Sequence, residues 1–441
     1  MKRRIYIRVA VLGVVAALAV WMATKSVPDQ SQQLADGSGL KLKAATYGKV
    51  QQFVHGNAWQ RLLLNGVPKR FLNKQGPWQK FTHYSLQKTD GRLITIAPES
   101  DSLVLWTVHH GAKQGWYQDN FIRAEVLDEN GIECDTAKIR HVDSGKGYEV
   151  AAWELSAFPR RGKRVGLRIY HQNGQWSRVA EFYVNNPVNR SYPIWQPEAL
   201  PATRSDGDLT VTLSDLSVGD LKPLWHSMLG FGQTRIALSF TESGQPSAAW
   251  EPVSFLIEDA TGNRREDWQF TMNDDYDREV GRILPGMFNP HEAWKLRIGV
   301  ARKEGAEFRA EELWTVRGAP FGEGQEGFSV STNLQGVSLC LTRTNASFTG
   351  NNHPVLEVSV SPPREDVRVS FVGATAEQGH AVTNIGTAYN RNGGKFFFYE
   401  IGSNKTNPRT LNLTMAIHRV RYFSFLAKPS FGATNQVSEK K

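Results

Sequence analysis

The sequence predicts an all-β protein made of three tandem antiparallel β-sandwiches behind an N-terminal transmembrane helix. Three observations support this fold class. An uncharged apolar run follows a basic start, strand-like segments then recur three times in one order, and no long stretch of helical period appears after the first run. The length of 441 residues suits roughly two to four domains.

The N-terminal segment, residues 1–24, opens with Lys2, Arg3, Arg4 and Arg8 and continues as an uncharged run. As a helix the run reaches about 24 Å, a little short of a hydrocarbon core. Two interpretations stay open: an uncleaved membrane anchor, which we favour, and a signal peptide cut near the weak Ala-x-Ala motif at 17–19. The first leaves a single-pass, extracytoplasmic protein and the second a secreted one, with the N-terminus starting in the cytoplasm.

The recurring strands divide the rest of the chain. Residues 25–44 are polar, carry Pro and Gly, and predict a flexible stalk. The predicted map then runs in order: leader plus first sandwich 45–187, linker 188–207, second sandwich 208–320, linker 321–328, third sandwich 329–430 and disordered tail 431–441. In the leader, the segment AWQRLLLNGV predicts a short docked helix.

Each copy of the repeat contains an apolar strand that enters a polar turn ending in glycine, at Gly131, Gly262 and Gly379. A second strand precedes that turn. A hairpin strand follows it, and a last apolar strand, closed by proline, returns beside the hairpin strand. Order and spacing both recur, which indicates an internal triplication.

The hairpin strand of each copy carries one equivalent leucine, Leu167, Leu296 or Leu413, found 34 to 36 residues after the turn glycine. Side chains alternate between the two faces of a strand. We therefore predict that these leucines point into three separate cores and that Arg168 and Arg297 point outward.

Short alternating strands with a turn every 8–12 residues or so are typical of antiparallel sandwiches. In this respect most of residues 90–430 resembles tandem immunoglobulin-like modules. The resemblance implies architecture alone, because such sandwiches host many functions.

The segment GEGQEG at 322–327 matches the glycine pattern of dinucleotide-binding loops. Such a loop needs a following helix whose N-terminus meets phosphate. Here a strand closed by Pro320 precedes the glycines and another strand follows, while Glu323 and Glu326 repel phosphate. The segment is predicted to be a linker, and no nucleotide is expected.

The net charge of +9 does not indicate a nucleic-acid partner, because four of the positive charges lie in the first eight residues and no basic cluster with aromatics remains. Cys134 and Cys340 are the only cysteines, too few for a zinc or iron–sulfur site. They fall in different repeats, so we predict that they do not pair. In VSLCLT, Cys340 shares a face with Ser338 and Thr342.

Few segments suggest chemistry, and no common hydrolase, metalloprotease or NTPase motif is present. Asp274, Asp275 and Asp277 form a weak calcium candidate, but neighbouring arginines favour a solvated loop. No cofactor is expected.

Aromatic residues divide into two predicted groups. Trp153, Trp294 and Trp314 lie in or beside repeated strands and are predicted to be core residues. The ligand-binding candidates lie in predicted loops or joints, and they are Trp116, Tyr117, Trp195 and Trp225. His109 and His110 are placed in the same surface loop as the first two.

The leading hypothesis is a non-enzymatic, membrane-tethered extracytoplasmic protein that acts as an interaction platform or spacer in the cell envelope. Its partner would be another envelope protein or a glycan. The alternatives are a glycan-binding protein that uses loop aromatics and an enzyme whose site is built from distant loops.

Overall fold

The computed structural model describes residues 30–55, 92–98, 101–111, 116–117, 122–145, 147–173, 175–188, 190–219, 233–267, 273–276, 279–285, 291–303, 307–320, 327–347, 352–362, 364, 366–376, 385–389, 395–400 and 410–431. Within these ranges every regular element is a β-strand except one turn of 3₁₀ helix, η1 (Ala310–Glu312). The all-β prediction is confirmed. No helix in these ranges has the length and apolar character needed to cross a membrane. The predicted anchor, residues 1–24, and the docked helix lie outside them.

The first unit, residues 30–188, has eight strands in one antiparallel order, β1-β2-β5-β8-β7-β6-β9-β10. They are β1 (Gln30–Gln33), β2 (Gly39–Gly48), β5 (Ser102–His110), β6 (Ile122–Leu127), β7 (Glu133–Gly145), β8 (Tyr148–Leu155), β9 (Arg164–Asn173) and β10 (Gln175–Asn185). Strand β7 pairs with both β6 and β8, so the sheet turns back on itself. Residues of both halves share one core.

The stalk predicted for residues 25–44 is wrong for residues 30–44, because these form β1 and most of β2 of this sheet. Their polarity misled the prediction, because β1 lies at a sheet edge and has no buried residue. In β2, Leu40 and Leu42 are fully buried.

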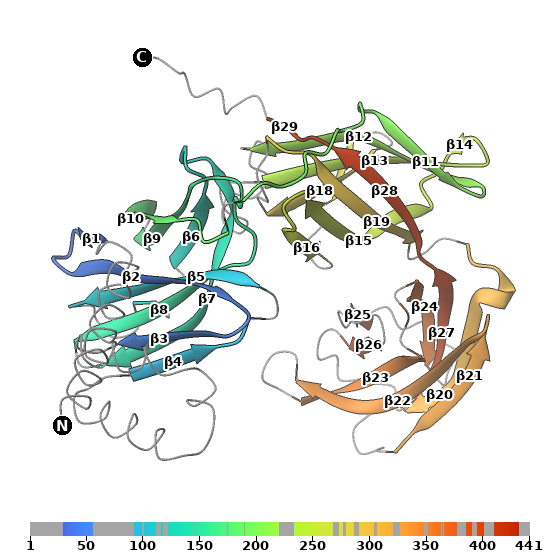
Figure 1. Ribbon diagram of the computed structural model, residues 1–441. Coiled ribbons are helices and arrows are strands. Elements are labelled where there is room, and N and C mark those ends of the chain that lie inside the picture. Colours follow the sequence, from blue (N-terminus) through green and yellow to red (C-terminus); the bar gives the residue numbers. More distant parts are fainter. Residues whose placement is uncertain are drawn as a thin grey trace, which may run out of the picture.

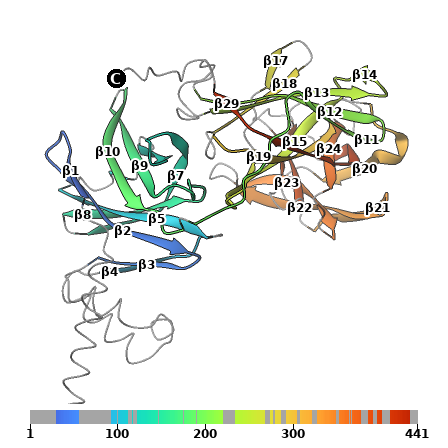
Figure 2. The same ribbon diagram turned by 45° about the horizontal axis from the view of Figure 1, so that its top comes forward.

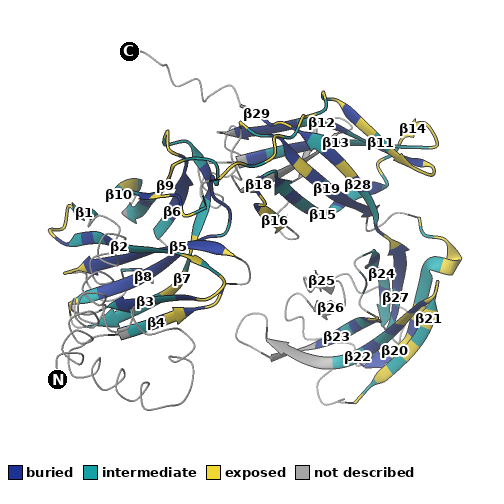
Figure 3. Cartoon of the chain, viewed as in Figure 1, coloured by how far each residue is buried: buried dark blue, intermediate teal, exposed yellow. Residues whose placement is uncertain are grey.

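A hairpin of β3 (Gln51–His55) and β4 (Arg92–Ile96) adds a third layer to the first unit, beneath β2, β5 and β8 (Figure 2). Phe53 of this hairpin stacks on Trp106, with ring centroids 5.1 Å apart. Strand β5 is therefore covered on both faces, as the dark strands of Figure 3 show. This explains why Leu103–Trp106 are consecutive apolar residues, since a strand without a solvated face needs no alternation.

The second unit consists of one sheet of order β11-β12-β13-β18-β17 and another of order β16-β15-β19-β28. The strands are β11 (Ala202–Asp206), β12 (Leu209–Gly219), β13 (Gln233–Glu242), β14 (Gln245–Pro246), β15 (Trp250–Asp259), β16 (Arg264–Asp267), β17 (Asn273–Tyr276), β18 (Glu279–Pro285), β19 (Trp294–Arg302), β28 (Arg421–Ala427) and β29 (Ser430–Phe431). Strands β14 and β29 pair with β13 and β12.

The third unit consists of a sheet of order β21-β22-β23-β26-β25 and one of order β20-β27-β24. The strands are β20 (Leu313–Pro320), β21 (Ser329–Leu334), β22 (Val337–Ser347), β23 (Asn352–Ser361), β24 (Val367–Ala376), β25 (Ile385–Tyr389), β26 (Lys395–Glu400) and β27 (Thr410–Arg419). Cys340 in β22 is half-buried beside Ser329, whereas Cys134 is fully buried, and both thiols are free.

Equivalent residues occupy equivalent places in the three units. Leu167, Leu296 and Leu413 are all fully buried, each in a different core, so their inward orientation is confirmed. The polar turns also match at atomic level. Asp128 accepts the backbone N–H groups two and four residues on, and Asp259 does the same. The turn glycines, Gly131 and Gly262, have positive φ angles, which favours glycine there.

The last strand of the repeat is exchanged between the second and third units. In the first unit Leu167 faces Phe182 of β10, the next strand along the chain. Leu296, however, faces Phe425 of β28, and Leu413 faces Val316 of β20. Figure 1 shows β28, red and near the C-terminus, beside β19 of the second unit.

This exchange corrects two predicted boundaries. β20, placed by the repeat in the second sandwich, completes the third unit, and β28 and β29, placed in the third sandwich and the tail, complete the second. In the sequence, the third unit therefore lies between β19 and β28, which both belong to the second unit. Both exchanged strands present apolar residues to their cores, among them Val316 of β20 and Phe425 of β28.

The core tryptophans follow the prediction in two of three cases. Trp153 and Trp294 are fully buried. Trp314 is half-buried and packs against the core of the third unit from its edge.

Candidate functional site

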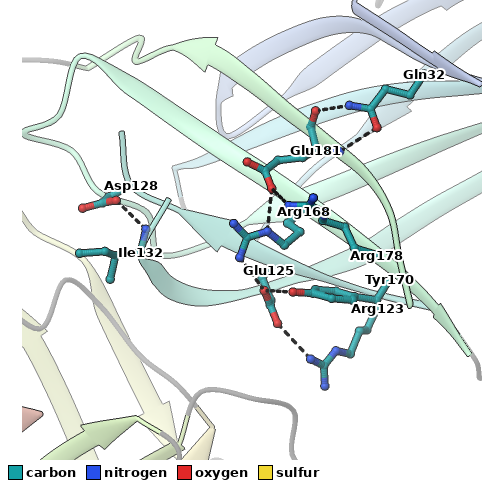
Figure 4. Close-up of polar contacts among 9 residues, drawn as sticks. All are labelled: Gln32, Arg123, Glu125, Asp128, Ile132, Arg168, Tyr170, Arg178 and Glu181. Carbon is teal, nitrogen blue, oxygen red and sulfur yellow. Dashed lines mark hydrogen bonds and ion pairs between the residues drawn. The ribbon is translucent and has the colours of Figure 1, made fainter. Parts of the chain in front are cut away.

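The outward face of strands β6, β9 and β10 carries a connected set of charged side chains (Figure 4). Glu125 of β6 is only 2% exposed, and its carboxylate lies 3.0 Å from Arg123 and 3.6 Å from Arg168. Tyr170 donates its hydroxyl to the same carboxylate at 3.0 Å. A buried carboxylate is tolerated here because guanidinium and hydroxyl groups satisfy it.

A second carboxylate extends this network to β10. Glu181 accepts a hydrogen bond from Arg168 Nε at 2.7 Å and another from Arg178 at 3.2 Å. Arg168 therefore bridges two acidic groups on neighbouring strands, as cross-strand pairs of opposite charge do. The result is a rigid polar surface with alternating charge.

The edge of β10 is closed by two glutamine side chains of β1. Gln32 donates to the Glu181 carbonyl at 2.7 Å and accepts from the Glu181 amide at 3.1 Å. Gln30 binds the carbonyl and the amide of Tyr183 in the same way. Each carboxamide replaces a peptide group of a neighbouring strand, so the exposed edge is protected without a further strand.

A polar pocket opens beside this edge. Its cavity volume is about 370 Å³. The residues that line it are Gln32, Arg178, Val179, Ala180, Glu181 and Tyr183. Val179 is the bulged residue at which the pairing of β10 with β9 shifts. Bulges re-aim side chains at sheet edges, and here the bulge lies beside the exposed Arg178 guanidinium.

The electrostatics of the pocket favour fixed protonation states. Although burial opposes it, hydrogen bonds from Arg168 and Tyr183 lower the pKa of Glu181, so this carboxylate is charged at neutral pH. Burial, followed by the bond to Glu181, raises the pKa of Tyr183. Burial and the nearby Glu125 raise the pKa of Tyr170 to about 12. These groups are suited to hydrogen-bonding a ligand rather than to exchanging protons with it.

The predicted loop around Trp116 is part of the first core rather than a surface site. His109, placed in that loop, lies in β5 and is fully buried. Tyr117 is 4% exposed and its hydroxyl lies 3.0 Å from that of Thr107. Trp116 stacks on His171 and packs edge-on against His109. Alternation could not predict the burial of His109, because β5 is covered on both faces, and it does not apply to Trp116 and Tyr117, which lie in a turn.

The other predicted candidates are Trp195, Trp225 and the three aspartates. Trp195 is half-buried in the segment that joins the first two units, next to the exposed Ile194. Trp225 and Asp277 lie outside the described residues. The backbone at Asp274 and Asp275 forms β17, paired with β18, although their side chains are outside the described set. Across the described part of the chain, His, Cys, Asp and Glu side chains nowhere gather in a group able to hold a metal.

Sequence reasoning missed the polar network and its pocket. The sequence predicts only that Arg168 points outward, and it predicts a stalk at Gln30 and Gln32. A signal was present, since glutamines two residues apart project on the same side of a strand. Their partner strand, however, lies about 150 residues away and cannot be located from spacing.

Comparison with known proteins gives only weak structural similarities. Neither a protein-family model nor a curated protein matches the chain. One similar solved structure is an uncharacterized Listeria monocytogenes EGD-e protein in complex with α-D-glucose, β-D-glucose, magnesium and calcium, at 9% identity and a TM-score of 0.15. Another is the cycloalternan-forming enzyme of Listeria monocytogenes with a pentasaccharide substrate, at 10% identity and a TM-score of 0.14. Each match covers 71% of this chain but 29% of the other, and such scores carry no inference about fold or activity.

Proposed function

We propose that this chain is a non-enzymatic extracytoplasmic protein in which immunoglobulin-like sandwiches form a rigid spacer and interaction platform, tethered by residues 1–24. The order of the strands supports the sandwich assignment. In the first unit β2-β5-β8-β7 faces β6-β9-β10, the arrangement of the ABED and CFG sheets of constant-type domains. The tether and the cellular location are proposals that follow from the sequence; resistance of the full chain to alkaline carbonate extraction from membranes would test them.

The joint between the first and second units carries the spacer proposal. Asn263, in the polar turn of the second unit, donates to the Phe158 carbonyl at 2.8 Å and accepts from the Phe158 amide at 3.3 Å. Asn263 is 1% exposed, and Ala157 beside Phe158 belongs to the core of the second unit. The segment of the first unit at residues 157–158 thus packs against the second unit.

Two ion pairs flank that hydrogen-bonded contact. Arg265 of β16 binds Asp135 of β7, a carboxylate that is 2% exposed. Arg161 binds Glu292 at 2.9 Å. Contacts of this kind restrict relative motion, whereas a flexible linker would leave both units free to rotate.

The joint is tested by small-angle X-ray scattering of the purified extracytoplasmic part. Asn263→Ala leaves the buried Phe158 backbone groups unpaired, which costs about 1–3 kcal/mol at the joint. We expect a larger radius of gyration and a broader distance distribution than in the wild type. Asn130→Ala is the matched control, because Asn130 is exposed in the corresponding turn of the first unit and hydrogen-bonds Asp128 of its own turn.

A wild-type profile that only a flexible ensemble can fit would reject the spacer role. Equal profiles for wild type and Asn263→Ala would show that this turn does not hold the joint.

The pocket beside β10 supports a second candidate, the binding of a polar ligand such as a glycan. Sugar hydroxyls both donate and accept hydrogen bonds, and the pocket offers a guanidinium, a carboxylate and a phenol side by side. On a glycan array, Arg178→Ala should weaken binding at least about tenfold, about 1.4 kcal/mol. Its fold should be intact because the side chain is 62% exposed. The absence of any glycan bound by the wild type would exclude this candidate.

A further inference from the structure

The joint between the second and third units contains two chain crossings. One runs from β19 through η1 to β20, and the other passes at Val420 between β27 and β28. Val420 donates its amide to the Asp366 carbonyl at 2.9 Å. A Cβ added to Gly299 of β19 would lie 3.0 Å from Val420, so the second unit packs directly on this crossing. The crossing at Val420 is one residue long, which makes it a natural hinge.

An ion pair connects the two units beside that hinge. Arg368 of β24 lies 2.9 Å from Glu251 of β15, and their side chains are 13% and 20% exposed. On the second unit, Arg302 of β19 pairs with Glu242 at 3.2 Å and donates to the Glu307 carbonyl of the crossing segment. The charges at the joint are therefore balanced in this arrangement.

His418 lies at the centre of this balanced arrangement. It is 3% exposed, is two residues from Val420, and stands directly opposite Arg368 in the β24–β27 register. Its Nε2 is 2.9 Å from Ser370 Oγ, and the Phe308 ring centroid is 5.1 Å away. Within the described part of the chain, its Nδ1 has no hydrogen-bond partner.

A proton on this ring would have no compensating charge. The nearby carboxylates, Glu251 and Glu242, already bind Arg368 and Arg302. Burial, together with Arg368 and Arg302, lowers the pKa of His418 to about 3. Like charges directly opposite each other on neighbouring strands are destabilising, and a buried unpaired cation is more so.

We infer that His418 is a proton-sensitive latch: while its ring is neutral the second and third units are held together, and its protonation releases the joint. Release lets water reach the imidazolium and separates it from Arg302, which belongs to the other unit. The inference is independent of the spacer and ligand proposals, because it concerns one joint and the proton alone.

The size of the effect follows from the difference in pKa. A water-exposed histidine titrates near 6.5 and the buried ring near 3. Lowering the pH from 7.5 to 5.0 should therefore raise the ratio of open to closed joint about thirtyfold.

The experiment measures the distance between the units in the full chain by double electron–electron resonance. Spin labels are placed at Gln245 in the second unit and Asn333 in the third, both exposed, in a Cys340→Ser background. We expect a single short distance at pH 7.5 and a growing longer population towards pH 5.0. In His418→Gln, which keeps a donor for Ser370 but cannot titrate, the distance should not change with pH.

His141→Gln is the matched control, since His141 is exposed on β7 of the first unit, and it should behave as the wild type. A wild type whose distances do not change, or a His418→Gln protein that opens over the same pH range, would overturn the latch. If His418→Gln does not fold, exchange of the imidazole C2 proton in the wild type still decides: a pKa near 6.5 for folded His418 contradicts the inference.

Discussion

At the scale of single residues, Arg168 shows that a side chain pointing away from the core can still stabilise the fold. It points away from the core, as expected from its place next to Leu167, but it connects Glu125 and Glu181. Arg168→Ala removes one partner from a carboxylate that is 2% exposed, so we expect a loss of about 1–3 kcal/mol in the free energy of unfolding. An outward orientation therefore does not make this substitution neutral.

Arg178→Ala is the matched control for Arg168→Ala. It removes a contact to the same Glu181, but its side chain is 62% exposed, and exposed ion pairs contribute about 0–1 kcal/mol. Urea unfolding of both variants decides the question. Equal losses would mean that Glu125 gains nothing from Arg168.

The same residues show what the sequence reveals and what it hides. Period-two alternation located Leu167, Leu296 and Leu413 because each strand has one buried face. It could not reveal the partner of Arg168, because an outward charge is solvated in most strands and its neighbours depend on strand pairing. It could not predict the burial of Tyr117 either, because Tyr117 lies in a turn outside the strands, where alternation gives no information about exposure.

At the scale of elements, the strand exchange predicts which unit a C-terminal truncation unfolds. A chain that ends at Val420 lacks β28 and β29, and with them Phe423, Phe425 and Ala427 of the second core. Loss of one buried Phe alone costs about 3–5 kcal/mol, so the second unit should unfold. The third unit keeps its complete set of strands, and its amides should stay protected in hydrogen exchange.

A chain that ends at Phe431 controls for this truncation, because it keeps β29 and should protect both units. Loss of protection in β22 and β27, with β12 and β19 unaffected, would contradict the exchange.

The repeat predicted the strands but assigned two of them to the wrong unit. Leucines at fixed spacing identify a hairpin strand, while its neighbour is determined by packing. Phe425 and Val316 are both apolar and both fit opposite a core leucine. The apolar pattern of the strands therefore cannot distinguish a tandem arrangement from an exchanged one. The short crossing at Val420 can, because it gives β27 and β28 no loop to form a hairpin.

At the scale of the whole molecule, the three units have separate cores, and the contacts at the two joints connect them. Asn263 at the first joint and Arg368 at the second lie on turns or strands of the repeat, so the repeated elements also form the contacts between units. None of these contacts has a sequence signature, because each pairs residues more than 100 positions apart. The predicted spacer thus depends on features visible only in the structure.

Acid should weaken the units unequally, because buried histidines are confined to two of them in the described part of the chain. Burial lowers the pKa of His109 in the first unit and of His418 in the third, while His291 of the second unit is exposed. The unfolded chain then binds more protons below about pH 6.5, so the free energy of unfolding falls as the pH falls. Carboxylates with lowered pKa, such as Glu181 and Asp366, lose their contribution only below about pH 4.5.

Between pH 6.5 and 5, we therefore expect hydrogen exchange, corrected for its intrinsic rate, to accelerate in β5 and β8 but not in β12 and β13. His109→Gln should remove most of this acid sensitivity from the first unit, because glutamine does not titrate and its amide retains a polar group beside Ser38. Asp135 and Glu292, whose pKa values burial raises, act in the opposite direction and stabilise the first joint as the pH falls. A uniform loss of protection across all units, or a loss that persists in His109→Gln, would show that the first unit's acid sensitivity arises elsewhere than at this buried ring.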